Sequence, residues 1–188
     1  MRRDNQPWLP AATADLDWQA RSAAPCPRSS MFGDIYYSTE NGLEESRYVF
    51  LHGNDLPGRW ALHPEDTFCV AETGFGTGLN FLLTWQAWRS LPESRPRLHY
   101  LAVEKYPLTR EDLDRALAAW PELGDLRGAL IEAYPMAVKG CHRLILDDHR
   151  LTLDLWWEDA TDTICDLSLI HISEPTRQLT QSRMPSCG

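Results

Sequence analysis

One short segment carries residues whose types and spacing could do chemistry. It consists of an acid, Glu72, followed by three glycines at alternate positions, Gly74, Gly76 and Gly78, and it comes directly after a short apolar run. Glycine allows the backbone to approach a ligand closely, because no Cβ stands in the way. A turn of this kind between a strand and a helix predicts a loop that holds a nucleotide cofactor. The competing interpretation is an ordinary glycine-rich turn.

The spacing of the glycines selects among nucleotide cofactors. A nicotinamide or flavin fingerprint requires G-x-G-x-x-G, and counting from Gly74 its last glycine would fall where this chain has Leu79. A phosphate-binding P-loop would end in Gly-Lys-Ser/Thr, and no lysine lies between Glu72 and Asn80. What remains is E-x-G-x-G-x-G, the pattern of class I S-adenosylmethionine (AdoMet) methyltransferases. In these enzymes an acid can lie beside the cationic amino-acid end of the cofactor.

The flanking sequence predicts the elements that would position this loop. Alternating strands and helices from about residue 67 onward favour an α/β fold with a parallel, doubly wound sheet. We expect a buried strand at 68–71, a helix at 79–89, a second parallel strand at 98–103, helices at 109–120 and 121–134, and a β-hairpin formed by 142–146 and 151–157.

Two further acids follow strands of this predicted sheet. In such sheets ligands bind at the carboxyl ends of the strands. Glu104 follows the second strand, where its carboxylate can accept hydrogen bonds from both ribose hydroxyls of a cofactor. Asp159 follows the hairpin, at a place where these folds often hold the adenine amino group. The competing interpretations are that each acid is a solvent-exposed residue at the end of a strand, or that Glu104 forms an ion pair with its neighbour Lys105.

The residues before the sheet form a separate N-terminal extension, for which we take the bounds 1–66. Its first 30 residues read as a loosely ordered lead-in with one short strand at 16–18. The runs 35–37 and 48–51 are β-prone and flank a polar stretch. They predict either a hairpin or a strand, turn and helix.

Composition limits the size of the fold and the classes of function. With 188 residues, 43% of them hydrophobic, the chain is long enough for one core. Its net charge of -9 shows no excess of basic residues of the kind expected in a protein that binds nucleic acid without a partner. The five cysteines and six histidines show no metal-ligand spacing, so we expect no metal site. No apolar run is long enough to cross a bilayer, and we expect a cytoplasmic location with no membrane partner.

Several motifs in order resemble a known family. They are the segments 33–38, 40–51, 72–81, 103–109, 135–136, 140–144 and 153–156. Together they are similar to the amino-terminal methyltransferase domain of the MnmC family, bacterial bifunctional enzymes of tRNA 5-methylaminomethyl-2-thiouridine synthesis. The likeness covers roughly residues 12 to 166. It implies a class I, Rossmann-like methyltransferase fold and AdoMet-dependent N-methylation of the aminomethyl group on the wobble uridine of tRNA.

The resemblance also implies the residues of the site. The family's AdoMet contacts correspond to Glu72, Gly74, Gly76, Gly78, Glu104 and Asp159. Asp159 follows Glu158, where the family usually has glycine, which weakens the adenine assignment. Three residues of the characteristic segment after position 40 are further candidates for contact with cofactor or acceptor: Asn41, Glu44 and Tyr48. FAD belongs to the C-terminal oxidase domain of bifunctional members, which this sequence lacks.

The likeness ends after Asp166. The family would continue into a strand and an Asp-Gly-Phe-x-Pro loop that reaches the acceptor amine, so the catalytic residues stay unassigned. Residues 167–188 instead resemble a translated sequencing adapter, and we interpret them as a non-native tail. We therefore expect a partial methyltransferase domain at 67–166, truncated after about the third strand, that binds AdoMet weakly or not at all and lacks activity. An aminopropyltransferase, a dinucleotide oxidoreductase and a non-catalytic interaction module stay open as alternatives.

Overall fold

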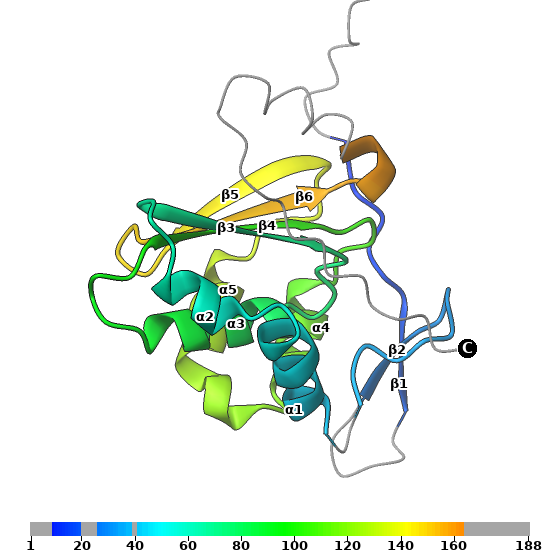
Figure 1. The fold of residues 1–188 in the computed structure, drawn as a ribbon. Coiled ribbons are helices and arrows are strands. Elements are labelled where there is room, and N and C mark those ends of the chain that lie inside the picture. Colours follow the sequence, from blue (N-terminus) through cyan, green and yellow to red (C-terminus); the bar gives the residue numbers. More distant parts are fainter. Residues whose placement is uncertain (1–8, 20–25, 39–40, 164–188) are drawn as a thin grey trace, which may run out of the picture.

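A four-stranded sheet organises the chain, with helices packed against one of its faces (Figure 1). The structure, a computed structural model, describes residues 9–19, 26–38 and 41–163. The strands of this sheet are β3 (Thr67–Thr73), β4 (Arg97–Val103), β5 (Gly140–Leu146) and β6 (Leu151–Trp157). Their order is β3-β4-β6-β5, in which β4 runs parallel to both β3 and β6 while β5 is antiparallel to β6. The carboxyl ends of β3, β4 and β6 therefore lie at one edge.

The strand and helix order predicted for this part of the chain is confirmed. The helices are α3 (Leu79–Arg89), α4 (Arg110–Leu117), η2 (Pro121–Leu123) and α5 (Gly124–Ala133). The single helix expected at 121–134 is thus a 3-10 turn followed by an α-helix. The start of α4 follows from its sequence, because the Thr109 hydroxyl accepts a hydrogen bond from the backbone N–H of Asp112 at 3.1 Å.

The N-terminal part contributes a small hairpin and a helical segment. Strands β1 (Leu16–Gln19) and β2 (Cys26–Ser29) pair antiparallel, so the short strand expected at 16–18 is present. They are followed by α1 (Gly42–Ser46), the π-helical η1 (Arg47–His52) and α2 (Leu56–Ala61).

Of the two alternatives for residues 35–51, the hairpin is wrong, since 48–51 lies within η1. The helix of the other alternative is present, but its strand at 35–37 is reduced to an isolated bridge between Ile35 and Arg28. Its side chains do not alternate between inside and outside: Tyr48 and Val49 are exposed, whereas Phe50 and Leu51 are buried. Leu43 is buried seven residues before Phe50, which is the spacing of one helix face. Burial of this face outweighs the weak β-propensity of the individual residues.

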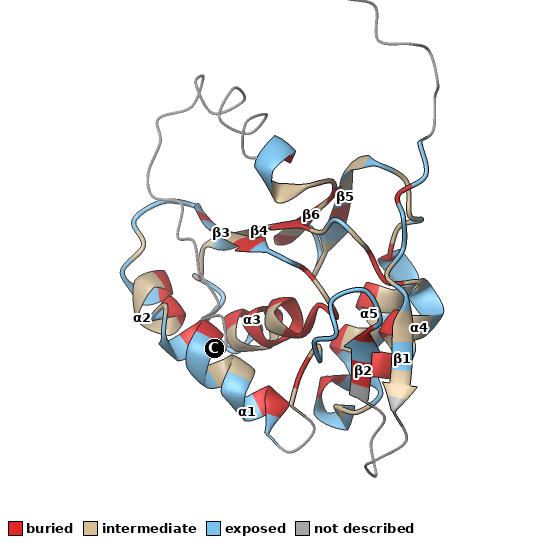
Figure 2. Ribbon diagram, turned by 90° about the vertical axis from the view of Figure 1, so that its right-hand side faces the viewer, coloured by how far each residue is buried: buried red, intermediate tan, exposed pale blue. Residues whose placement is uncertain are grey.

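The core lies between the sheet and the helix that follows the glycine loop. The helix α3 buries aromatic and aliphatic side chains on several sides, and Figure 2 shows it as the most buried helix under the sheet. Phe81 and Trp88 are completely buried, and the Phe81 ring meets the Tyr100 ring of β4 edge-on at 5.1 Å between centroids. Each such side chain stabilises the fold by roughly 2–3 kcal/mol. The loop before α3 is thereby fixed at its C-terminal side by the core.

The opposite face of the sheet differs from the doubly wound expectation. The helices α1 to α5 all lie on one side (Figure 1). Cys69 and Arg143 are exposed and alternate with the buried Phe68 and Leu144, so they lie on the other face. On that face Asp154 of β6 accepts hydrogen bonds from Arg143 Nε at 2.8 Å and from the His99 ring at 2.9 Å. The expected non-native tail at 167–188 lies outside the described residues.

Candidate cofactor site

The glycine loop connects the carboxyl end of β3 to the start of α3. All three glycines have positive φ, at +85° for Gly74, +54° for Gly76 and +69° for Gly78. This left-handed region strains any residue with a side chain. A Cβ on Gly78 would stand 2.8 Å from Cζ of Phe75, and one on Gly76 would stand 3.3 Å from Cδ1 of Tyr36. The spacing read from the sequence is thus imposed by backbone geometry and by close packing.

Glu72 lies beneath this loop and is buried. One carboxylate oxygen accepts a hydrogen bond from Asn80 Nδ2 at 2.8 Å, and the other accepts one from the Tyr100 hydroxyl at 2.8 Å. Burial raises the pKa of Glu72 from 4.5 to about 7, although the hydrogen bonds from Asn80 and Tyr100 lower it. Glu72 therefore joins the end of β3 to the first turn of α3 and to β4. Its charge changes near neutral pH.

Glu104 stands at the edge of the sheet, next to the loop. Its carboxylate accepts hydrogen bonds from the backbone N–H of Gly76 at 3.0 Å and from that of Tyr106 at 2.9 Å. Its own backbone N–H bonds to the Trp156 carbonyl at 2.8 Å, which continues the pairing between β4 and β6. Burial raises the pKa of Glu104, and the backbone hydrogen bonds partly offset this rise. The sequence-predicted Gly76 and Glu104 are therefore in direct contact.

Asp159 reaches the same edge from the end of β6. Its carboxylate pairs with Lys105 Nζ at 2.9 Å and accepts a hydrogen bond from the backbone N–H of Thr161 at 2.9 Å. The hydrogen bond from Lys105 is the main reason that the pKa of Asp159 is lowered to about 2. Lys105 follows Glu104 directly, so this ion pair links Asp159 to the residue next to Glu104. Glu158, the departure from the family pattern, pairs with Lys139 at 3.7 Å.

The three candidates from the segment after position 40 lie on the α1 and η1 helices. Asn41 precedes α1, and Glu44 forms an exposed ion pair with Arg47 at 2.9 Å. Arg47 in turn donates a hydrogen bond to the side chain of Gln86 on α3 at 3.0 Å. Tyr48 is 74% exposed. Among the described residues, no hydrogen bond or ion pair joins Asn41, Glu44 or Tyr48 to the glycine loop, so this segment reaches the middle of α3 instead.

Two tyrosines near Glu104, Tyr36 and Tyr134, are not indicated as site residues by the sequence pattern. Burial, with the nearby charge of Glu104 as a smaller cause, raises the pKa of Tyr36 to about 12. Tyr134 is buried, and desolvation raises the pKa of its hydroxyl far above the usual range, with Glu104 and Tyr36 adding to the rise. Both hydroxyls therefore stay protonated and can act as donors. Tyr36 lay in a run interpreted only as β-prone, and no local pattern indicated that it would reach Gly76.

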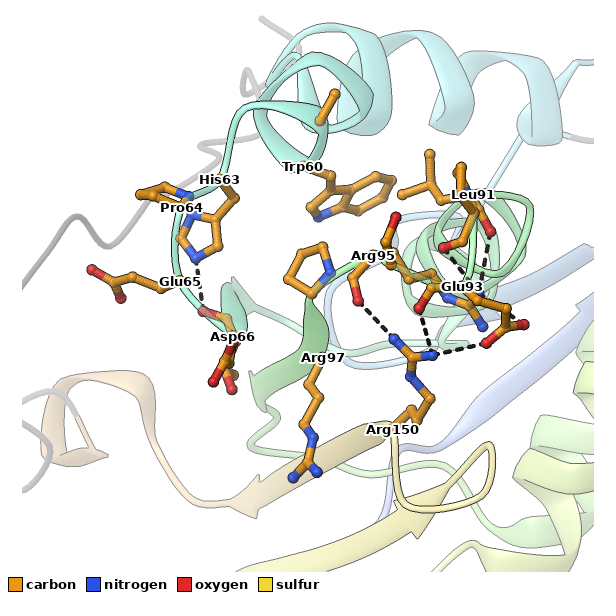
Figure 3. Close-up of a pocket in the computed structure, with 15 residues that line it drawn as sticks. Trp60, His63, Pro64, Glu65, Asp66, Leu91, Glu93, Arg95, Arg97 and Arg150 are labelled. Carbon is orange, nitrogen blue, oxygen red and sulfur yellow. Dashed lines mark hydrogen bonds and ion pairs between the residues drawn. The ribbon is translucent and has the colours of Figure 1, made fainter.

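A further cavity lies at the other end of the strands. It measures about 1040 Å³ and is lined by residues that precede β3, β4 and β6, together with the end of α2 (Figure 3). Polar side chains in its wall already pair with each other or with the backbone, as Arg150 does with Glu93 at 2.9 Å and with the Arg95 carbonyl at 2.6 Å. It holds none of the acids or glycines predicted from sequence. Glu72, the three glycines and Glu104 lie instead at or next to the opposite, carboxyl edge.

In the described ranges, no three or more His, Cys, Asp or Glu side chains are grouped so as to hold a metal ion. No helix within those ranges combines the length and hydrophobicity that a bilayer crossing requires.

Comparison with known proteins tests the resemblance. The chain is 52% identical over 161 residues to the "tRNA 5-methylaminomethyl-2-thiouridine biosynthesis bifunctional protein MnmC" of Acinetobacter baylyi, a match that covers 85% of this chain. It is 53% identical over 154 residues to the protein of the same name from Aeromonas hydrophila, with 80% of this chain covered. The resemblance to MnmC is confirmed. The chain spans only about a quarter of the length of these MnmC proteins, 26% and 23%.

A solved structure supports the fold. The chain superimposes on "MNMC2 from Aquifex Aeolicus" with a TM-score of 0.53 at 19% sequence identity, covering 82% of this chain and 45% of the other. At this identity the likeness concerns the fold alone, and it agrees with a Rossmann-like α/β architecture. No family model matches the sequence.

Proposed function

We propose that this chain carries the AdoMet site of a methyltransferase that N-methylates the aminomethyl group of the wobble (2-thio)uridine in tRNA. The observation that carries the proposal is the contact between the Gly76 backbone N–H and the Glu104 carboxylate, at 3.0 Å. It joins the glycine loop of one strand to the acid of the next at a single sheet edge. Parallel α/β sheets bind nucleotide cofactors at this kind of edge.

The residues at this edge fit AdoMet better than the cofactors of the competing interpretations. A Cβ at Gly76 would crowd Tyr36 and one at Gly78 would clash with Phe75, whereas a Cβ at Gly74 would meet no atom within 4 Å, so a ligand has room to approach the backbone at Gly74. The loop lacks both the glycine at position 79 of a dinucleotide fingerprint and the lysine of a P-loop. A cationic cofactor without a pyrophosphate needs neither.

Each residue at the edge has a proposed role. Glu104 accepts hydrogen bonds from the ribose hydroxyls, Gly74, Gly76 and Gly78 let the backbone approach the cofactor, and Asp159 faces the adenine. Glu72 supports the loop from below and adds negative charge near the amino-acid end. When bound, AdoMet supplies a methyl group on a sulfonium, so the methyl passes to the amine nitrogen and a neutral thioether leaves.

The remaining task of the protein concerns the acceptor amine. A free alkylamine has a pKa of roughly 10, so presenting it unprotonated at neutral pH costs about 4 kcal/mol. Correct placement of the nucleophile can offset on the order of 7–11 kcal/mol of the barrier. Positioning and deprotonation of the amine are therefore what the acceptor side of the site must provide. A tRNA acceptor would also place the reaction in the cytoplasm.

Ligand-observed saturation-transfer NMR on the 188-residue chain tests the cofactor, because it detects weak binding. We expect saturation transfer to AdoMet and none to NADH. Glu104→Gln should reduce the signal from the ribose protons of AdoMet, because the carboxylate is its proposed partner. Glu132→Gln, an exposed acid on α5, is the matched control and should change nothing.

Three results would contradict the proposal. Transfer to NADH but not AdoMet would favour an oxidoreductase, and transfer to decarboxylated AdoMet alone would favour an aminopropyltransferase. A non-catalytic interaction module predicts that Gly76→Val leaves function untouched, whereas the cofactor site predicts that this change abolishes binding of AdoMet.

A further inference from the structure

A recess beside Glu104 is formed by the loop that follows β2. It measures about 240 Å³, and it adjoins the cofactor site because Glu104 is part of its wall. The rest of the wall comes from the N-terminal hairpin region and from Tyr106, which follows β4. Neither the glycine loop nor Asp159 lines this recess. It therefore offers a second place for a ligand within reach of the same edge.

The recess carries exposed apolar and aromatic side chains. Phe32 is 63% exposed and Ile35 is 59% exposed, although both are large hydrophobic residues. The Phe32 ring meets the Tyr106 ring at 5.9 Å between centroids, and half-buried Tyr36 completes the aromatic lining. Exposed aromatic rings of this kind bind unstacked RNA bases, which are recognised mainly in single-stranded loops. A flat heterocycle would cover the apolar surface that these side chains leave open.

The charge of the wall is uniformly negative. Asp15, Asp34 and Glu104 line the recess, and no lysine, arginine or histidine is among the described residues that line it. Arg28, which donates to the Gly33 carbonyl of the same loop, and Lys105, which pairs with Asp159, do not line the recess. A wall with three carboxylates disfavours a phosphate and favours a cation. The recess thus combines stacking surface with a preference for positive charge.

We propose that this recess binds the acceptor nucleobase, a pyrimidine that carries a protonated aminomethyl group. The ring packs against Phe32 and Tyr106, and the ammonium faces Asp15 and Asp34. This inference rests on the proposed function, since the methyl transfer requires an alkylamine on a pyrimidine. At neutral pH that amine arrives protonated, and it must lose this proton before it can accept the methyl group. The inference assigns substrate recognition to the N-terminal extension, which the cofactor does not need.

The experiment uses two nucleosides as probes, 5-aminomethyluridine and uridine, in chemical-shift titrations of the 188-residue chain. We expect 5-aminomethyluridine to bind more tightly than uridine. Phe32→Ala should weaken both by roughly 10-fold, a loss typical of one base–aromatic stack. The matched control is Leu62→Ala, since Leu62 is 85% exposed and remote from the wall of the recess.

A second pair of variants tests the charge. Asp34→Asn should reduce the preference for 5-aminomethyluridine over uridine several-fold while leaving the affinity for uridine nearly unchanged. Asp17→Asn is the control, because Asp17 is an exposed acid of the same hairpin that does not line the recess. If both variants lowered the preference equally, the preference would be explained by the overall charge of the chain, and the inference would be overturned.

Further outcomes would also overturn it. Equal affinity for the two nucleosides would remove the role of the carboxylates. Competitive displacement of 5-aminomethyluridine by S-adenosylhomocysteine would make the recess part of the cofactor site. Self-association that Phe32→Ala abolishes would identify a second copy of the chain as the occupant. AdoMet binding is measured separately. If the nucleosides do not bind as expected while AdoMet still binds, this inference is overturned and the proposed methyltransferase function stands. If AdoMet itself does not bind, the proposed function is contradicted.

Discussion

Replacing Glu72 with glutamine separates the charge of this acid from its shape. Glutamine retains the length and an acceptor for Asn80, and its amide can donate to the Tyr100 oxygen, so the loss of hydrogen bonding costs about 1 kcal/mol. The variant cannot ionise. Any difference in pH dependence between Glu72→Gln and the wild-type chain therefore reports the titration of this single carboxyl.

The magnitude follows from the raised pKa. Folding moves the pKa of Glu72 from 4.5 to about 7, so between these values the folded chain binds more protons than the unfolded chain. The stabilisation from this group is complete below pH 4.5 and is lost as the pH rises through 7. A shift of this size corresponds to about 3 kcal/mol overall, most of which is lost between about pH 5 and pH 8.

Urea unfolding of both chains at about pH 5 and pH 8, followed by tryptophan fluorescence, measures this loss. We expect the wild type to lose about 2–3 kcal/mol of unfolding free energy relative to Glu72→Gln over this interval. Glu132→Gln, which removes an exposed acid, should follow the wild type. Parallel pH profiles of the wild type and Glu72→Gln would refute the reasoning, because they would mean that Glu72 is ionised in the folded state without cost.

Three other predictions concern the cofactor edge and the open face of the sheet. A cationic ligand near Glu72 favours its ionised form, so AdoMet binding measured by NMR should tighten between about pH 6 and pH 8 in the wild type and not in Glu72→Gln. Gly76→Ala should weaken AdoMet binding at least 10-fold, because its φ of +54° and the 3.3 Å approach of its Cβ to Tyr36 distort the loop, while unfolding experiments should show a stability loss of only about 1–2 kcal/mol. The His99 ring, whose pKa is raised to about 9 mainly by its hydrogen bond to Asp154, should titrate near its usual value of about 6.5 in Asp154→Asn, as followed by NMR of the ring protons.

The part of the site that could be predicted from sequence is local. The glycine spacing needs only the backbone geometry of one turn, and Glu104 follows from the rule that parallel strands end at a common edge. The bounds of α3 also follow from local signals, with Gly78 in the left-handed region directly before it and Ser90 directly after it. These features depend on residues close in the chain.

The parts that could not be predicted depend on contacts between distant residues. Tyr36 reaches Gly76 across 40 positions, and no periodicity encodes that approach. The strand interpretation of 48–51 was wrong because burial against α3 decides its conformation. The hydrogen bonds from His99 to Asp154 and from Arg143 to Asp154 join residues on three strands, and their partners can be identified only once the order β4-β6-β5 is known.

Two of the three acids of the proposed site, Glu72 and Glu104, are held in different ways, and we expect one to act mainly on stability and the other on ligand binding. Glu72 is buried and is held by two side chains, so it couples the loop to the core and its replacement acts mainly on folding. Glu104 is held by the backbone N–H groups of Gly76 and Tyr106, which orient the carboxylate without any loss of side-chain entropy by the donors. A carboxylate accepts at about four positions, so these two donors leave room for the hydroxyls of a ribose. Because Glu104 is already oriented in the free protein, little free energy is lost in ordering its side chain when the ligand binds. Each new hydrogen bond from the ligand therefore contributes more to the affinity.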